Sequence, residues 1–115
     1  MDNKSCEEEI NEEIKEVKIQ RKMEKELGGK HQACLAGVAD IVTDKEVIEI
    51  KKWKNWKEAL GQILAYKLFF PDKSPKVHFF GKFPKHETQM MIFAVFTHYK
   101  ITVTWEAQKY ERMML

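Results

Sequence analysis

The chain has 115 residues, 43% of them hydrophobic and 33% charged, and this composition predicts one globular domain with a single core. Its net charge of +2 does not by itself predict a nucleic-acid partner. The chain has only two cysteines, and neither a signal peptide nor an apolar run of membrane-spanning length is visible. We therefore expect no disulfide framework, no membrane and an intracellular setting, either the cytoplasm or nucleus or a virus- or phage-encoded intracellular protein.

The first predicted element is a helix over residues 6–27, because its apolar side chains recur at helical spacing. Gly28 and Gly29 end it, as glycines commonly end helices. Residues 1–5 are predicted to be disordered, and residues 6–115 to form the single domain.

Three strands are predicted next, over residues 30–36 and on both sides of a turn within residues 37–51, where β-branched residues are frequent. We expect Asp44 and Lys45 to form a two-residue hairpin loop. The resulting register pairs Val42 with Val47, Ile41 with Ile48, Asp40 with Glu49, and Val38 with Lys51.

The second half of the chain alternates between helix and strand. It is predicted to contain a helix over residues 56–70, strands over 76–80 and 101–105, and a short helix after Glu106. The apolar segment 86–98 fits either a helix or a strand, and its length and residues favour a helix. Strand-helix-strand steps imply right-handed crossovers between parallel strands. The fold class is therefore α/β, with a mixed central sheet flanked by helices on both faces.

The predicted hairpin places Asp40 and Glu49 opposite each other and Lys51 on the same face. Two carboxylates facing each other across a strand pair repel, so something must compensate. Mg²⁺ would do so, since it binds one or two carboxylates together with waters and phosphates, and Mn²⁺ is expected to substitute for it. The alternative is a solvated hairpin in which Lys51 partly neutralises two exposed acids.

Charge is distributed unevenly along the chain. Eight glutamates lie between Glu7 and Glu26, whereas residues 45–85 contain ten lysines and four acidic residues. Lys52, Lys54 and Lys57 alternate with Trp53 and Trp56, which suggests contacts with a phosphate backbone. Lysine-rich faces are also often no more than solvated surface, and the two tryptophans can simply anchor the helix that follows.

Together these residues resemble the core of the PD-(D/E)XK nuclease superfamily, the restriction-endonuclease-like fold with an αβββαβ core. The resemblance covers residues 13–105. Asp40 stands at the aspartate of the signature, Glu49-Ile50-Lys51 matches the E-x-K element, Gln62 to Tyr66 matches the Q-x-x-x-Y motif, and Ala39 replaces the usual proline.

The resemblance implies a role for each matching residue. Asp40, Glu49 and the carbonyl of Ile50 would bind Mg²⁺, with Glu16 of the first helix as a further ligand and Glu13 and Glu24 as alternatives to Glu16. Lys51 would activate water and stabilise the transition state. Gln62 would orient the nucleophile or contact phosphate, unless it only packs on Tyr66. Lys52, Lys54, Lys57 and Tyr66 would contact DNA.

The function expected from the resemblance is that of a Mg-dependent endodeoxyribonuclease, with Holliday-junction resolvase-like structure selectivity and a homodimer as options. The alternative is a catalytically inactive nuclease-fold module that binds DNA or another partner. A third hypothesis is a small α/β interaction protein whose charges are all surface.

Overall fold

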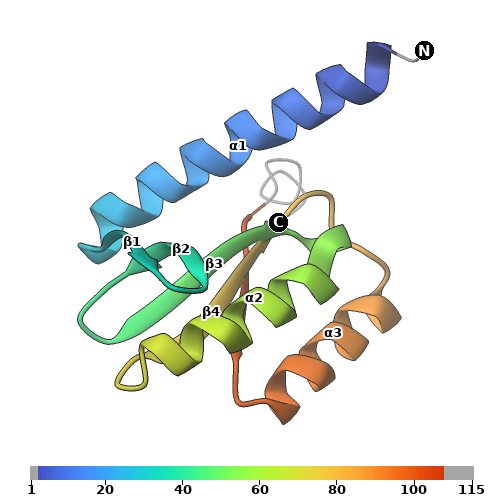
Figure 1. Cartoon of the computed structure of the whole chain (residues 1–115). Coiled ribbons are helices and arrows are strands. Elements are labelled where there is room, and N and C mark those ends of the chain that lie inside the picture. The colour runs from blue at the N-terminus through green and yellow to red at the C-terminus, as the bar shows by residue number, and fades with distance from the viewer. Residues whose placement is uncertain (1–2, 108–115) are drawn as a thin grey trace.

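The computed structural model describes residues 3–107, with side chains described from residue 9 onward, and it forms three layers (Figure 1). The helices are α1 (Asn3–Leu27), α2 (Trp56–Phe69) and α3 (His86–His98), with a short 3-10 turn, η1 (Trp53–Asn55), before α2. The strands are β1 (Lys30–Cys34), β2 (Gly37–Val42), β3 (Glu46–Lys52), β4 (Ser74–Phe80) and β5 (Thr102–Trp105). Helix α1 crosses one face of the sheet, whereas α2 and α3 cover the other.

The five strands lie side by side in chain order, and the sheet is mixed. β1, β2 and β3 are joined by antiparallel pairing, whereas β3, β4 and β5 are parallel neighbours. Each parallel step is connected by a helix, α2 between β3 and β4 and α3 between β4 and β5, as parallel strands require. The predicted α/β class, with a mixed sheet between helices, is confirmed.

Most predicted elements differ from the observed ones by only a few residues at their ends. α1 begins at Asn3, inside the stretch 1–5 that was predicted to be disordered, and β1 ends at Cys34, before the predicted end at residue 36. The short helix predicted after Glu106 would fall mainly on residues 108–115, which lie outside the described residues. No helix among residues 3–107 is both long enough and apolar enough to cross a membrane.

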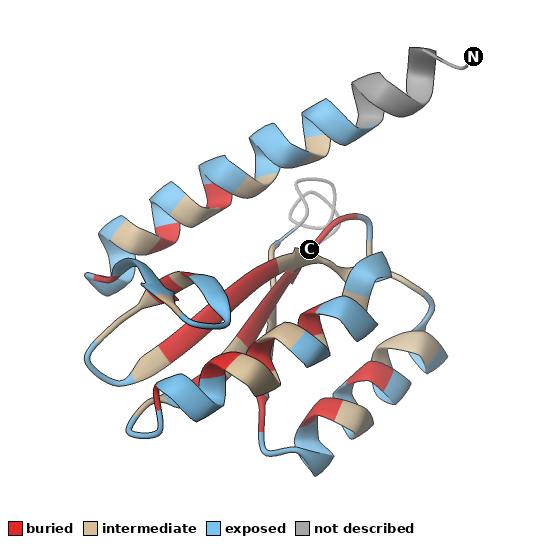
Figure 2. Ribbon diagram, in the orientation of Figure 1, coloured by how far each residue is buried: buried red, intermediate tan, exposed pale blue. Residues whose placement is uncertain are grey.

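Strand β3 lies at the centre of the sheet and contributes to two cores. Val47 faces α2 and α3, whereas Ile48 and Ile50 face α1, and all three are fully buried. The larger core contains Ala39, Val47, Ala59, Ile63, Tyr66, Phe70, Val77, Phe79, Ile92, Phe96 and Ile101, and the smaller one contains Ile19, Met23, Ile41, Ile48, Ile50 and Phe80. Figure 2 shows the buried residues concentrated along β3 and β4. A strand that is covered on both faces is normally apolar on both faces, so the buried Glu49 of β3 requires a specific partner.

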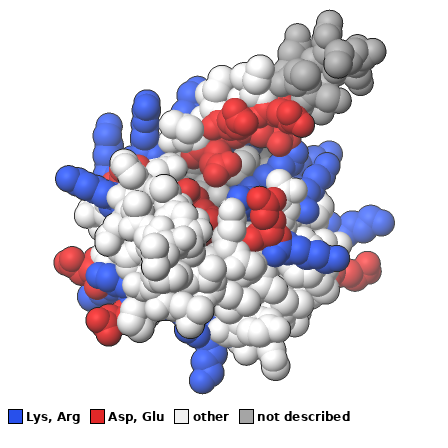
Figure 3. All heavy atoms as spheres, in the orientation of Figure 1, with Lys and Arg blue, Asp and Glu red and all other residues white. Residues whose placement is uncertain are grey.

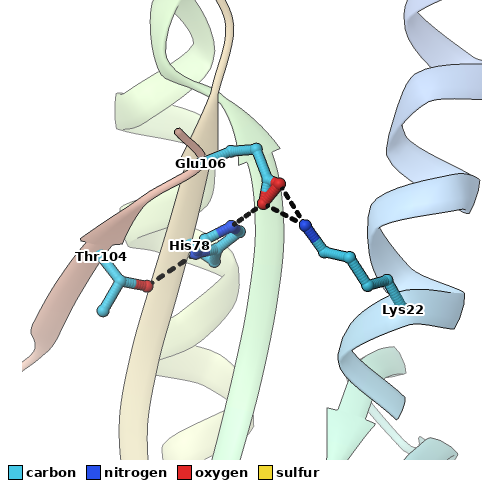
Figure 4. Close-up of polar contacts among 4 residues, drawn as sticks. All are labelled: Lys22, His78, Thr104 and Glu106. Carbon is cyan, nitrogen blue, oxygen red and sulfur yellow. Dashed lines mark hydrogen bonds and ion pairs between the residues drawn. The ribbon is translucent and has the colours of Figure 1, made fainter. Parts of the chain in front are cut away.

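A polar cluster connects α1 to the side of the sheet that carries β5 (Figure 4). Lys22 of α1 donates to the Glu106 carboxylate at 2.6 and 2.9 Å. His78 of β4 lies 3.3 Å from Glu106 through Nε2 and 2.7 Å from the Thr104 hydroxyl through Nδ1. This cluster helps to hold α1 at a fixed position over the sheet.

The cluster should make stability depend on pH. Burial lowers the pKa of His78, and Glu106 offsets this only in part. The folded state therefore favours the neutral imidazole, so stability is lost as the pH falls below the ordinary His pKa of 6.5. The pKa of Glu106 is also lowered, since hydrogen bonds from Lys22 and His78 outweigh the effect of burial. Protonation of Glu106 at low pH therefore also reduces the stability of the folded protein.

Replacing His78 with glutamine should therefore reduce the loss of stability between pH 7 and pH 5, because glutamine does not titrate. Urea unfolding of the parent and of His78→Gln at both pH values measures this, and the difference between the two proteins isolates the histidine. An equal loss in both proteins would show that His78 does not contribute to it.

Candidate functional site

The turn between β2 and β3 has the predicted geometry. Thr43 N–H donates to the Glu46 carbonyl at 2.9 Å, and Glu46 N–H donates to the Thr43 hydroxyl at 2.9 Å. The ladder pairs Ile41 with Ile48 and Val42 with Val47, so the predicted register is confirmed at these two positions.

Asp40 leaves this ladder and makes a different contact. Its Oδ2 accepts a hydrogen bond from the backbone N–H of Ile50 at 2.8 Å, and its carbonyl accepts one from Gln20 of α1 at 3.1 Å. The predicted pairing of Asp40 with Glu49 across a regular ladder is therefore wrong. β2 is irregular here where it pairs with β1, and the Asp40 carboxylate lies against the Glu49 side chain of β3.

Glu49 is the charged residue of the central strand, and its side chain is only 3% exposed. Burial, followed by the hydrogen bond to Asp40 and the charge of Asp40, raises the pKa of Glu49 to about 10. At neutral pH Glu49 is therefore protonated and donates to the Asp40 carboxylate. A shared proton removes the repulsion between the two acids without a metal ion.

Two further charged side chains approach the Asp40–Glu49 pair, which we call the acidic pair. Glu16 approaches from α1, and burial together with the charge of Asp40 raises the pKa of Glu16. Lys51 follows Glu49 on β3, and its Nζ lies 3.7 Å from Glu58 of α2. The structure thus brings together the predicted residues Asp40, Glu49, Glu16 and Lys51 from three elements.

A three-carboxylate metal set is not formed. Within residues 3–107, no three His, Cys, Asp or Glu side chains are arranged so that they could hold a metal ion together. The backbone N–H of Ile50 donates to Asp40, and metal binding by the Ile50 carbonyl stays a prediction. The carboxylate donors for Mg²⁺ at this place would be the two of the acidic pair, a number that Mg²⁺ accepts when waters complete its shell.

Mg²⁺ and Mn²⁺ binding stays a prediction, and it has a definite thermodynamic signature. The ion would have to displace the proton from Glu49, so binding should release protons and tighten as the pH rises. Calorimetric titration with Mg²⁺ in two buffers of different ionisation enthalpy should give different heats, and Asp40→Ala should abolish them. Heat that is unchanged in Asp40→Ala would place the ion elsewhere.

The Q-x-x-x-Y residues lie on α2 beside the acidic pair. Tyr66 is 5% exposed, and its hydroxyl donates to the Val38 carbonyl at 3.0 Å. The predicted DNA contact of Tyr66 does not fit this burial, and Tyr66 instead fixes β2 against α2. The Oε1 atom of Gln62, one turn earlier, is buried and has no hydrogen-bond partner among the described residues.

Of the predicted DNA-binding lysines, Lys52 ends β3, and Lys54 and Lys57 follow it. Lys54 and Lys57 are exposed, whereas Lys52 is half-buried and forms an ion pair with Glu12 of α1. The two tryptophans between these lysines pack against the larger core. In Figure 3, acidic side chains follow α1 and the hollow beneath it, and basic side chains stand beside them.

A pocket of about 240 Å³ lies beside these lysines, between α1 and the ends of β3 and β4. It is lined by Glu12, Lys15, Lys52, Trp53, Lys54, Phe80, Gly81 and Lys82. Sequence reasoning did not find Lys15, Lys82 or Glu12, because they are distant in sequence and carry no motif. The clustering of the other lysines after β3 was the only available signal.

Comparison with known proteins finds relatives that are named for a family other than the PD-(D/E)XK nucleases. KilA-N domain-containing protein L32 of Acanthamoeba polyphaga mimivirus, a provisional name, is 42% identical over 74 residues, or 64% of this chain and 20% of that protein. The similarly named R878 of the same virus is 38% identical over 73 residues, or 63% of this chain and 20% of that protein. For the similarly named L33 the identity is 36% over 68 residues, or 58% of this chain and 28% of that protein. The matched segments thus span less than a third of each relative's length.

No protein-family model matches the chain, and no solved structure matches it either. The relatives are named for a family other than the PD-(D/E)XK nucleases, so the identification as such a nuclease is wrong, as is the endonuclease function drawn from it. The error has a physical basis. The D…E-x-K triple is short enough to arise by chance, and a raised pKa that keeps Glu49 protonated also relieves the repulsion between its two acids.

Proposed function

We propose that this chain is a DNA-binding module that contacts the phosphate backbone through the lysines at the end of β3. The observation that carries the proposal is the convergence of Lys52 and Lys54 with Lys15 and Lys82 around one pocket at the end of the sheet, with the exposed Lys57 close by in sequence. Such a surface attracts a polyanion without regard to base sequence and releases its counterions on binding.

The relatives support this proposal from an independent direction. They are named for the KilA-N domain, and KilA-N domains are DNA-binding domains. This is the DNA-binding alternative of the sequence analysis, in which the chemistry of the nuclease family is absent. The viral origin of the relatives also supports the predicted intracellular, virus-encoded setting.

The acidic pair is compatible with a nearby phosphate backbone. Two ionised carboxylates would repel DNA, but burial and the contact with Asp40 raise the pKa of Glu49 to about 10, so the Glu49 carboxyl adds no negative charge at neutral pH. Lys51, two residues further along β3, adds a positive charge near the pair. The repulsion that the pair exerts on a bound strand is therefore small.

Fluorescence anisotropy with a short labelled duplex, and with one of its strands alone, tests the proposal directly. We expect saturable binding that weakens steeply as salt is raised, and competition by unlabelled duplex. Incubation of the same protein with supercoiled plasmid and Mg²⁺ measures independently whether it cleaves DNA. Unchanged anisotropy of both probes at low salt would refute DNA binding.

A further inference from the structure

The pocket beside Trp53, which we call the basic pocket, is rich in lysines, and one of its sides is held in place by a hydrogen bond. Four lysines and one glutamate line it. The indole Nε1 of Trp53 donates to the Lys82 carbonyl at 2.6 Å, which fixes the loop after β4 against η1. Gly81 has a φ of +107°, and a Cβ there would lie 3.2 Å from Trp53 Cδ1, so this side of the pocket depends on the close approach.

The lysines of the basic pocket are held from three sides. Lys15 comes from α1 and places its Nζ 5.9 Å from the centre of the Phe80 ring. Lys52 comes from β3, and its side chain is 23% exposed, so its ammonium is held within the groove. Lys82 belongs to the loop after β4. Lysines contributed by separate elements around one hollow repel one another, and an anion placed among them relieves this repulsion.

Glu12 is the anion that occupies this position in the protein alone. It reaches from α1 to form an ion pair with Lys52, and its own side chain is 38% exposed. Glu12 also marks a boundary, because a second hollow shares Glu12, Lys52 and Phe80 with the basic pocket. That second hollow is lined by Glu9, Glu13, Glu16 and Glu58, so a phosphate is favoured only on the basic side.

We propose that the basic pocket binds one backbone phosphate of DNA. In the protein alone Glu12 forms an ion pair with Lys52, and the phosphate displaces Glu12 from Lys52 on binding. This inference rests on the proposed DNA binding and adds to it a specific phosphate site and an internal competitor. Glu12 is suited to this role because it is the more exposed partner of a partly exposed ion pair, and such pairs are weak enough for a phosphate to displace. The half-buried Lys52 stays in place to receive the phosphate.

Replacing Glu12 with glutamine should therefore tighten DNA binding. We expect an increase in affinity of about two- to fivefold, the factor that corresponds to breaking a partly exposed ion pair. The matched control is Glu26→Gln, which makes the same change of charge at an exposed position on the same helix, away from the basic pocket. Anisotropy titrations of the parent and both variants with one labelled duplex measure the difference.

A second pair of substitutions tests the lysines themselves. Lys15→Gln combined with Lys82→Gln should weaken binding and lower the slope of log K against log salt by about one, because one phosphate contact is lost. Melting curves of all variants verify that each protein is folded at the assay temperature.

The outcomes separate the two proposals. If the parent binds DNA but Glu12→Gln gains no more affinity than Glu26→Gln, the basic pocket is not the phosphate site and DNA binding itself stands. An unchanged salt slope in the Lys15 and Lys82 variant leads to the same conclusion. If the parent does not bind DNA, both proposals are refuted. A gain specific to Glu12→Gln, together with the lower salt slope, supports the site.

Discussion

Replacing Glu49 with glutamine should raise the free energy of unfolding at neutral pH by about 3 kcal/mol. The folded protein holds the Glu49 proton because its pKa is about 10, whereas the unfolded chain releases it above the ordinary value of 4.5. Keeping that proton at pH 7 costs about 3 kcal/mol of stability. Glutamine is neutral in both states, and its amide can donate to Asp40 as the protonated carboxyl does.

The sign of the effect fixes its pH dependence. A carboxyl with a raised pKa contributes a stability that is present at low pH and is lost as the pH rises from the ordinary pKa toward the raised one. The advantage of Glu49→Gln should therefore be small near pH 4.5 and should grow steadily through pH 8. His78 and Glu106 change stability in the opposite direction, but they do so equally in both proteins.

Thermal melts in buffer with a metal chelator measure this prediction. At neutral pH the midpoint should rise by roughly 10 °C or more, given the usual entropy of unfolding for a domain of this size. Asp72→Asn, an exposed change in the loop after α2, is the matched control and should leave the midpoint unchanged. A lower midpoint for Glu49→Gln at pH 8 would mean that Glu49 is ionised in the folded protein.

Hydrophobic patterns and turn residues were enough to predict the fold class and most of the elements. The hairpin register near the turn depends on Asp44 and Lys45, which are local in sequence, so it could be predicted. Farther from the turn the predicted register failed at Asp40. At this point β2 is irregular against β1 and Gln20 of α1 donates to the Asp40 carbonyl, and a local sequence pattern contains neither contact.

Only part of the candidate site could be predicted, again because a local sequence pattern does not contain contacts between distant elements. Lys52, Lys54 and Lys57 are clustered in sequence and were found. Lys15 and Lys82 join Lys52 and Lys54 in the basic pocket from elements that only the fold brings together, so they were missed. The proton shared by the acidic pair depends on the burial of Glu49, which the sequence does not state. Short motifs led to a nuclease family because residue identity alone cannot distinguish a metal site from a protonated pair.

Replacing Lys54 and Lys57 together with glutamine should weaken DNA binding about 30-fold at 0.15 M salt. Each lysine that neutralises a phosphate releases nearly one counterion, so the loss of both lowers the slope of log K against log salt by about two. Both side chains are exposed, so the substitutions should change stability little. Anisotropy titrations over a range of salt concentrations give the affinity and the slope from one experiment.

The control must remove the same charge from a different surface. Lys45 lies in the turn before β3 and Lys67 in the last turn of α2; both are exposed and belong to the end of the sheet opposite Lys54 and Lys57. If the protein bound DNA only through its overall charge, Lys45→Gln with Lys67→Gln would weaken binding as much as the first pair. If DNA binds at the end of β3, the Lys54 and Lys57 substitutions should weaken binding clearly more than the Lys45 and Lys67 substitutions. The reason is that electrostatic contacts are screened beyond about 10 Å at moderate salt. Equal losses from the two pairs would remove Lys54 and Lys57 from the interface.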